Sequence, residues 1–193
     1  MKQTARKIKK HKNKTVKTKK GRLRVFTEEE YNSNDGMNTS IWGPCFWLVL
    51  HTMSFNYPVN PSEEDKLNYK NLILNLQNVL PCKYCRINLK KNMTLLPLTQ
   101  NSMKNRESFS RYVYELHEVV NKMLGKKSGL TYETVRERFE HFRGRQGAEN
   151  NNKEKGCADS LYGKKSKCII KIIPKETKCD TLQINKKCLK KLK

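Results

Sequence analysis

The residues in this chain best suited to do chemistry are its cysteines. Seven are present, of which only Cys82 and Cys85 form a close pair; the others are Cys45, Cys157, Cys168, Cys179 and Cys188. A structural zinc site usually takes four ligands as two close pairs, so the spacing disfavours zinc and we expect no metal site. A Cys-x-x-Cys motif at a helix N-terminus favours a thiolate, because the helix dipole and unpaired N–H groups lower the pKa of the first thiol. The spacing indicates a redox dithiol, with half a zinc knuckle or an inert disulfide as alternatives.

The elements that must position this pair are helices. Between residues 38 and 143, apolar residues recur at spacings of three and four, which is typical of amphipathic helices. The predicted helices cover about residues 39–55, 62–80, 106–124 and 131–143, and a short helix opened by Pro81 carries the dithiol. Four or five such helices joined by short loops predict an all-α bundle.

Local signals support these boundaries. Ser62 and Asp65 have the N-cap and N3 spacing of a capping box, Gly125 suits a helix C-terminus, and Thr131 suits an N-cap. A loop is expected near residues 95–105. Beyond residue 143 only residues 168–173, and more weakly 181–184, have the pattern of a short β segment.

The charge of the chain belongs to its ends. The formal net charge is +23, yet residues 26–143 hold fifteen basic and thirteen acidic residues. We therefore expect three parts: a basic disordered tail over 1–37, a helical domain over 38–143 and a basic, Cys-containing segment over 144–193. The first tail suits a solubilising arm, adhesion to nucleic acid or another polyanion, or nuclear import. The longest apolar stretch, residues 41–57, is too short and too polar to cross a bilayer, so no membrane span is expected.

The dithiol stands between two other motif segments in the helical part. The first runs from Trp42-Gly43-Pro44 through Trp47 and Leu50-His51-Thr52 to Tyr57-Pro58. The second is Pro81-Cys82-x-x-Cys85-Arg86, and the third runs from Leu116-His117 through Val119-Val120-Asn121 to Leu124-Gly125-Lys126. In this order and spacing, over about residues 40–143, the chain resembles the Erv/ALR family of FAD-linked sulfhydryl oxidases.

The resemblance implies a four-helix bundle plus a short fifth helix that holds FAD beside the dithiol. It implies that Cys85 is the flavin-proximal thiol, which attacks C4a and gives a charge-transfer thiolate, and that Cys82 exchanges with incoming dithiols. The implied reaction forms disulfides in protein substrates and passes electrons through FAD to O2, which gives hydrogen peroxide. The positions implied to line FAD are Gly43, Trp47, His51, Tyr57, His117, Val120, Asn121, Lys122, Lys126 and Phe139.

The residue types make sense beside the resemblance. An aromatic stripe that ends in His51 and Tyr57 can sandwich a flavin or an adenine, and Lys122, Lys126 and Lys127 can meet a pyrophosphate. The competing interpretation is that such a stripe is simply core.

Two departures from the family pattern are visible. Many cellular members have Asn where this chain has Glu118. Those members also have a disulfide between the two positions that map to Tyr114 and Thr131 in this chain. Both cysteines are missing together, which points to the branch found in large DNA viruses. The expected location is then the host cytoplasm or the virion; for a cellular protein it is the mitochondrial intermembrane space.

Further expectations concern partners and the remaining cysteines. The resemblance implies a homodimer through the first two helices. On the second of these helices Leu72, Leu76 and Val79 offer a partner surface, and we expect Cys45, on the first, to be a buried free thiol. Family members commonly use a second cysteine pair on a tail as a shuttle, which here must come from Cys157, Cys168, Cys179 and Cys188. These four suit a structural staple equally well. The competing functions are a basic nucleic-acid-binding protein with a Cys-rich, zinc-binding module and a structural virion protein.

Overall fold

The computed structural model describes residues 17–18, 21–22, 27–34, 36–145, 159–160, 167–169, 171–174, 176–177 and 183–188. The chain divides into two compact units, Met1–Gly36 and Met37–Lys193. In the first, strands β1 (Lys17–Thr18) and β2 (Gly21–Arg22) pair antiparallel, and one helical turn, α1 (Glu28–Tyr31), follows. The sequence analysis did not anticipate α1, although Thr27 and Glu30 form the capping box that signals it. The predicted disordered tail and the three-part division of the chain stay predictions.

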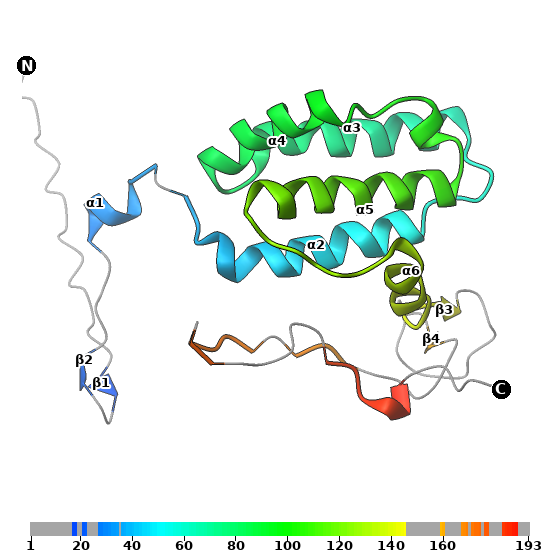
Figure 1. The fold of residues 1–193 in the computed structure, drawn as a ribbon. Coiled ribbons are helices and arrows are strands. Elements are labelled where there is room, and N and C mark those ends of the chain that lie inside the picture. The colour runs from blue at the N-terminus through cyan, green and yellow to red at the C-terminus, as the bar shows by residue number, and fades with distance from the viewer. Residues whose placement is uncertain are drawn as a thin grey trace, which may run out of the picture. The chain divides into compact units, whose positions relative to one another are not determined.

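Helices dominate residues 37–143 of the second unit. They are α2 (Thr39–Phe55), α3 (Glu63–Val79), α4 (Lys83–Leu95), α5 (Arg106–Met123) and α6 (Tyr132–Glu140), with a 3₁₀ turn, η1 (Asn101–Met103), before α5. Figure 1 shows α2 and α5 side by side, with α3 and α4 as a second layer and α6 across the end of α2. This is the predicted all-α architecture of four helices plus a short fifth.

The helix ends follow from the side chains at each boundary. The predicted capping box at Ser62 and Asp65 is present, and Thr131 caps α6 as predicted. Gly125 has a φ of 66°, the left-handed conformation that ends α5. One detail was wrong: Pro81 does not open the helix that carries the dithiol, because Cys82 is the N-cap and Pro81 lies before it.

The core lies between α2, α3, α4 and α5. The fully buried Tyr57, Ile73, Met103, Phe109 and Val113 form its centre. Leu76, which we expected on a partner surface, is buried in this core, whereas Leu72 is half-buried and Val79 is exposed.

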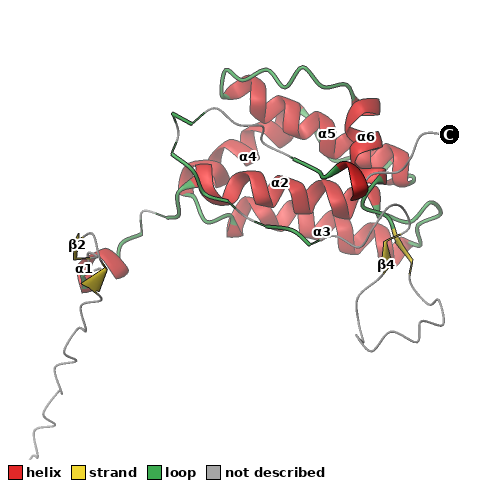
Figure 2. Ribbon diagram, turned by 90° about the horizontal axis from the view of Figure 1, so that it is seen from below, coloured by secondary structure: helices red, strands yellow, loops and turns green. Residues whose placement is uncertain are grey.

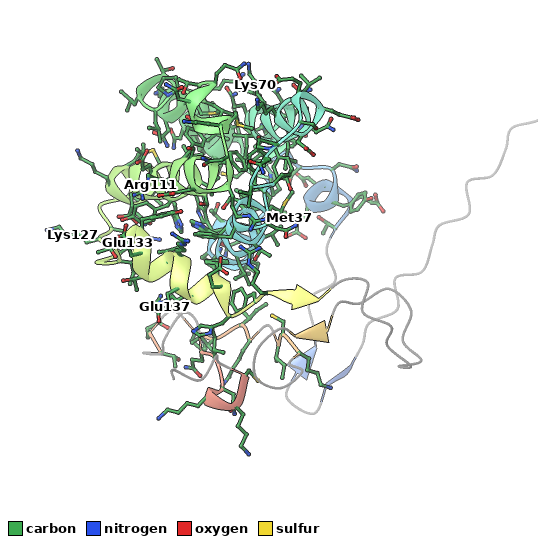
Figure 3. All side chains as sticks on the ribbon, turned by 90° about the vertical axis from the view of Figure 1, so that its right-hand side faces the viewer. Met37, Lys70, Arg111, Lys127, Glu133 and Glu137 are labelled. Carbon is green, nitrogen blue, oxygen red and sulfur yellow. The ribbon has the colours of Figure 1, made fainter. Side chains whose placement is uncertain are left out.

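Helix α6 is held to α5 by polar and aromatic contacts near the positions, Tyr114 and Thr131, that the resemblance to cellular family members singled out. The hydroxyl of Tyr114 donates to the Leu130 carbonyl over 2.7 Å, directly before the Thr131 cap. The guanidinium of Arg111 lies 4.0 Å from the ring centre of Tyr132. Figure 3 shows Arg111 of α5 near Glu133 of α6, and their charged atoms are 3.9 Å apart. A polar and aromatic cluster therefore joins α5 to the start of α6.

The described residues contain little strand (Figure 2). After the helices, β3 (Gly144–Arg145) pairs antiparallel with β4 (Asp159–Ser160), and a 3₁₀ turn, η2 (Lys186–Cys188), lies near the end. The β segment predicted over 168–173 is wrong for the residues described there, none of which is in a strand. A strand needs a hydrogen-bonded partner, and an apolar run alone does not supply one. No helix in the described part of the chain is long and apolar enough to span a membrane.

Candidate thiol redox site

The dithiol lies at the start of α4. Cys82 is the N-cap, and its sulfur accepts a hydrogen bond from the Cys85 amide over 3.2 Å. Both cysteines are free thiols. Burial tends to raise the pKa of Cys82, but hydrogen bonds from Cys85, Thr39 and the Tyr84 amide outweigh burial and lower it below its ordinary value. Burial and the hydrogen bond to Cys82 raise the pKa of Cys85. The two thiols therefore differ, and Cys82 is the one that ionises more readily.

Three contacts fix the dithiol against the beginning of α2. The Met37 amide donates to the Pro81 carbonyl over 2.8 Å, and the Trp42 indole donates to the Met37 carbonyl over 3.1 Å. The hydroxyl of Thr39, the first residue of α2, lies 3.7 Å from the sulfur of Cys85. Cys85 also packs against the core cluster. Cys85 therefore faces the interior and α2.

A line of predicted cofactor residues continues along α2 from this point. Gly43, Trp47 and His51 stand one helical turn apart. Gly43 is buried, yet a β-carbon built there would meet only the methyl group of Thr39, at 3.4 Å. Among the described residues, Thr39 is therefore the side chain that a β-carbon at Gly43 would meet within 4 Å, and the same Thr39 lies against Cys85.

Aromatic and imidazole rings from three helices meet at the far end of this line. Trp47 stacks on His117 of α5 with 3.9 Å between ring centres and 5° between planes. The Nε2 of His51 lies 3.0 Å from the Nδ1 of His117, and the ring of Phe139 of α6 lies 5.2 Å from that of His51. The structure thus brings Trp47, His51, His117 and Phe139 into one cluster.

The histidines of this cluster are neutral at ordinary pH. Burial, with a smaller contribution from the charge of His117, lowers the pKa of His51 to about 3. Burial lowers the pKa of His117 to about 4, while Glu118 opposes the shift and Lys126 adds to it. The Nδ1 of His51 is buried and has no hydrogen-bond partner within the described chain. A buried polar atom without a partner costs about 1–3 kcal/mol, so this nitrogen has room for a hydrogen bond that the described residues do not supply.

The other predicted cofactor residues are distributed more widely. Val120 and Asn121 are half-buried on α5, and the Asn121 amide donates to the Glu118 carboxylate over 2.9 Å. Lys122 and Lys126 are exposed at the C-terminal end of α5. Tyr57 instead belongs to the core: it has no exposed surface, and its hydroxyl donates to the Met103 carbonyl over 2.9 Å. The structure gives no support to Tyr57 as a cofactor residue.

Thr39 is the residue of this site that the sequence analysis missed. The Thr39 hydroxyl lies against the sulfur of Cys85, and the Thr39 methyl group lies 3.4 Å from where a β-carbon at Gly43 would be. The signal was its place one helical turn before Gly43, on the face that carries Trp47 and His51.

The remaining cysteines lie elsewhere. Cys45 is a half-buried free thiol on α2, and its sulfur lies 3.9 Å from the Ile41 carbonyl oxygen. Cys168 is exposed, Cys188 is half-buried and both are free, whereas Cys157 and Cys179 lie outside the described residues. A shuttle or a staple built from these four stays a prediction. Within the described ranges, no group of three or more His, Cys, Asp and Glu side chains could hold a metal ion.

A helical bundle that sets a Cys-x-x-Cys helix start against a line of aromatic and imidazole rings defines a thiol–disulfide redox protein. Residues 44–140 match the model of the Erv1 / Alr family, and the chain belongs to this family. A probable FAD-linked sulfhydryl oxidase of Acanthamoeba polyphaga mimivirus is 38% identical over 104 residues, 54% of this chain and 72% of the relative. An FAD-linked sulfhydryl oxidase of African swine fever virus is 37% identical over 86 residues, 45% of this chain and 70% of the relative. The crystal structure of the yeast Erv1 core covers 61% of this chain and 92% of that one, with 22% identity and a TM-score of 0.49.

The residues present fit a flavin. A planar group with hydrogen-bonding edges suits the unpartnered Nδ1 of His51, the rings around it and the open space beside Gly43. Exposed lysines at the end of α5 suit the phosphates of a dinucleotide.

Proposed function

We propose that this protein is an FAD-dependent thiol oxidase that forms disulfide bonds in protein substrates. The observation that carries the proposal is the N-cap dithiol, which the Thr39 hydroxyl and the Met37–Pro81 hydrogen bond hold against the Gly43 end of the ring cluster. Bound FAD supplies a two-electron acceptor that molecular oxygen can reoxidise to give hydrogen peroxide.

The chemistry of the chain itself is thiol–disulfide exchange. When Cys82 and Cys85 are joined, a substrate thiolate attacks the Cys82 sulfur, and the sulfur of Cys85 leaves as a thiolate. A second substrate thiolate then displaces Cys82, which leaves the substrate with a disulfide and the enzyme with two thiols. The helix-capping hydrogen bonds that lower the pKa of Cys82 also make it the better leaving group in this second step.

The geometry supports a division of labour between the two cysteines. Cys85 packs against the core and lies beside Thr39, on the side that leads to Gly43. We therefore assign Cys85 to electron transfer toward FAD and Cys82 to exchange with substrate. Gly43, Trp47, His51, His117 and Phe139 would hold the flavin ring system. Val120 and Asn121 would line the site further along α5, and Lys122 and Lys126 would meet the phosphates.

The test combines a spectrum with three cysteine variants. The purified chain should carry about one flavin and oxidise dithiothreitol with release of hydrogen peroxide. Cys82→Ser and Cys85→Ser should each abolish oxidation while flavin stays bound. Cys45→Ser is the matched control, because the sulfur of this half-buried thiol lies against the Ile41 carbonyl of its own helix, and its loss should leave turnover unchanged. Wild-type turnover in either active-site variant, or a colourless protein, would contradict the proposal.

The C-terminal cysteines would serve this reaction as an electron shuttle. A folded substrate cannot easily present a buried dithiol to Cys82, and an exposed thiol such as that of Cys168 can reach it first. Replacing Cys157, Cys168, Cys179 and Cys188 together by serine should then preserve oxidation of dithiothreitol and strongly reduce oxidation of a reduced protein. Equal activity on both substrates would indicate a structural role for these cysteines.

Two further features belong to the same proposal. A homodimer through α2 and α3 would now rely on Leu72 and Val79 rather than on the buried Leu76. Sedimentation of a monomer at micromolar concentration would argue against it. The similarity to two viral oxidases favours the host cytoplasm or the virion over the mitochondrial intermembrane space, and the basic ends of the chain would bind polyanions there.

A further inference from the structure

A cleft of about 260 Å³ lies between the C-terminal part of α3 and the adjacent face of α4. Gln77, Asn78, Lys83, Arg86, Ile87 and Lys90 line it. None of these residues belongs to the ring cluster around His51. The cleft is smaller than the pockets that enclose small molecules, roughly 300–1,000 Å³, and suits side chains of a segment that passes over it.

The cleft is positively charged. Three of its six lining residues are cations, and the others are two amides and an isoleucine. Helix α4 contains no acidic residue, and in the described part of the chain no carboxylate forms an ion pair with Lys83, Arg86 or Lys90. Arg86 is held in place because its guanidinium donates to the Leu80 carbonyl, which uses one of its five N–H donors. The remaining donors suit a carboxylate.

Two residues that line the cleft are sequence neighbours of the dithiol. Lys83 stands between the two cysteines in sequence, Arg86 follows Cys85, and Lys90 lies one helical turn further along α4. Between the cysteines, Tyr84 is 75% exposed, as large aromatic side chains at protein interfaces commonly are before binding. A chain segment seated in the cleft therefore has one end next to Cys82.

We propose that this cleft docks an acidic segment of the protein substrate adjacent to its dithiol. The inference rests on the proposed function, since it names the substrate class of the same site. Docking brings the two substrate thiols to the Cys82–Cys85 disulfide. Two electrons and two protons pass to the enzyme cysteines, one substrate disulfide forms, and the bound oxidant of the proposed reaction restores the enzyme disulfide. A nucleic acid would match the positive charge of the cleft, but it brings no thiol to Cys82, and its phosphates would gain nothing from contact with the apolar side chain of Ile87.

The experiment compares two reduced peptides with the same Cys-x-x-Cys core, one flanked by glutamates and the other by lysines. For the full-length holoenzyme at low salt, kcat/KM for the acidic peptide should exceed that for the basic peptide about tenfold, and high salt should reduce this ratio. Lys90→Glu should bring the ratio close to one. Lys91→Glu makes the same charge change at the neighbouring exposed position outside the cleft and should keep the ratio. Because each ratio compares two substrates of one protein, a general effect on turnover cancels.

A binding assay tests the cleft without turnover. Fluorescence anisotropy should show that the Cys82→Ser/Cys85→Ser variant binds the acidic peptide more tightly than the basic one, and that Lys90→Glu abolishes this preference. The docking site would be overturned if the wild type showed the same kcat/KM for the acidic and the basic peptide. It would also be overturned if Lys91→Glu lost the preference for the acidic peptide as fully as Lys90→Glu. Lys90-dependent binding of a single-stranded oligonucleotide without binding of the acidic peptide would also overturn it. Oxidation of dithiothreitol by the wild type tests the proposed function separately, so the two failures can be told apart.

Discussion

Acidification from pH 7 to pH 5 should destabilise this protein through the pair formed by His51 and His117. In the fold, burial lowers the pKa of His51 to about 3 and that of His117 to about 4. In the unfolded chain both imidazoles titrate near the ordinary value of 6.5. Between these values the unfolded state binds more protons than the folded state, so stability falls as the pH falls.

The size of the effect follows from the unfolded chain. At pH 5 protonation of an imidazole with a pKa near 6.5 stabilises the unfolded state by about 2 kcal/mol relative to pH 7, while the folded pair stays neutral. The two histidines together should therefore lower the free energy of unfolding by about 4 kcal/mol. This is a large part of the roughly 5–15 kcal/mol by which a domain is stable.

The measurement is urea unfolding of the wild type and of His51→Gln at pH 7, 6 and 5. The variant lacks one of the two titrating groups, so its loss of stability between pH 7 and 5 should be about half that of the wild type. Contributions from other groups, such as the Glu140 carboxylate, whose pKa its hydrogen bond to Arg143 lowers, cancel in the comparison. The reasoning fails if the wild type loses less than about 1 kcal/mol over this range, or if the two proteins lose the same amount.

Three substitutions test single contacts of the site and its frame. Thr39→Val should raise the pKa of the Cys82 thiol, because the Thr39 hydroxyl hydrogen-bonds to the dithiol. The pKa is measured as the pH dependence of the rate of Cys82 alkylation, and an unchanged profile would exclude this role for Thr39. Tyr114→Phe should lower the free energy of unfolding by about 1 kcal/mol through loss of the bond to Leu130, whereas Tyr31→Phe, at a position that is 82% exposed, should not. Gly43→Ala should leave the free energy of unfolding unchanged or raise it by up to about 1 kcal/mol, because among the described residues the added β-carbon meets only Thr39. The same variant should bind less flavin per chain. Loss of folding would show that the space beside Gly43 is filled.

The helices were predictable because their signals are local. Apolar spacing and the capping residues Ser62 and Thr131 indicate where α3 and α6 begin. The helix start at Cys82 was harder, because proline is tolerated at several positions around a first turn and only the backbone shows which residue is the cap. The run at 168–173 has strand composition, but pairing depends on a partner that composition does not specify.

The grouping of the ring cluster was predictable where one helix carries several of its residues. Gly43, Trp47 and His51 share a face through simple periodicity, and the motif around His117 places a second helix beside it. In the sequence, Tyr57 comes directly after the aromatic residues of α2, but it lies beyond the end of that helix. Its side chain is buried in the core, where the hydroxyl donates a hydrogen bond to the Met103 carbonyl. The cationic cleft was not predictable, because Gln77 and Asn78 come from α3 and only the packing of α3 on α4 brings them to Lys90.

The contacts that hold α6 to α5 also hold Phe139 in the ring cluster of a protein whose dithiol undergoes oxidation and reduction in the proposed reaction. Phe139 reaches His51 only while α6 stays on α2 and α5. A disulfide between the positions of Tyr114 and Thr131, which the family resemblance implies for many cellular members, is open to reduction by an excess of thiol substrate. Here the Tyr114 hydrogen bond and the contact of Arg111 with Tyr132 have no redox chemistry. The contacts that hold Phe139 beside His51 therefore do not depend on the oxidation state of any cysteine.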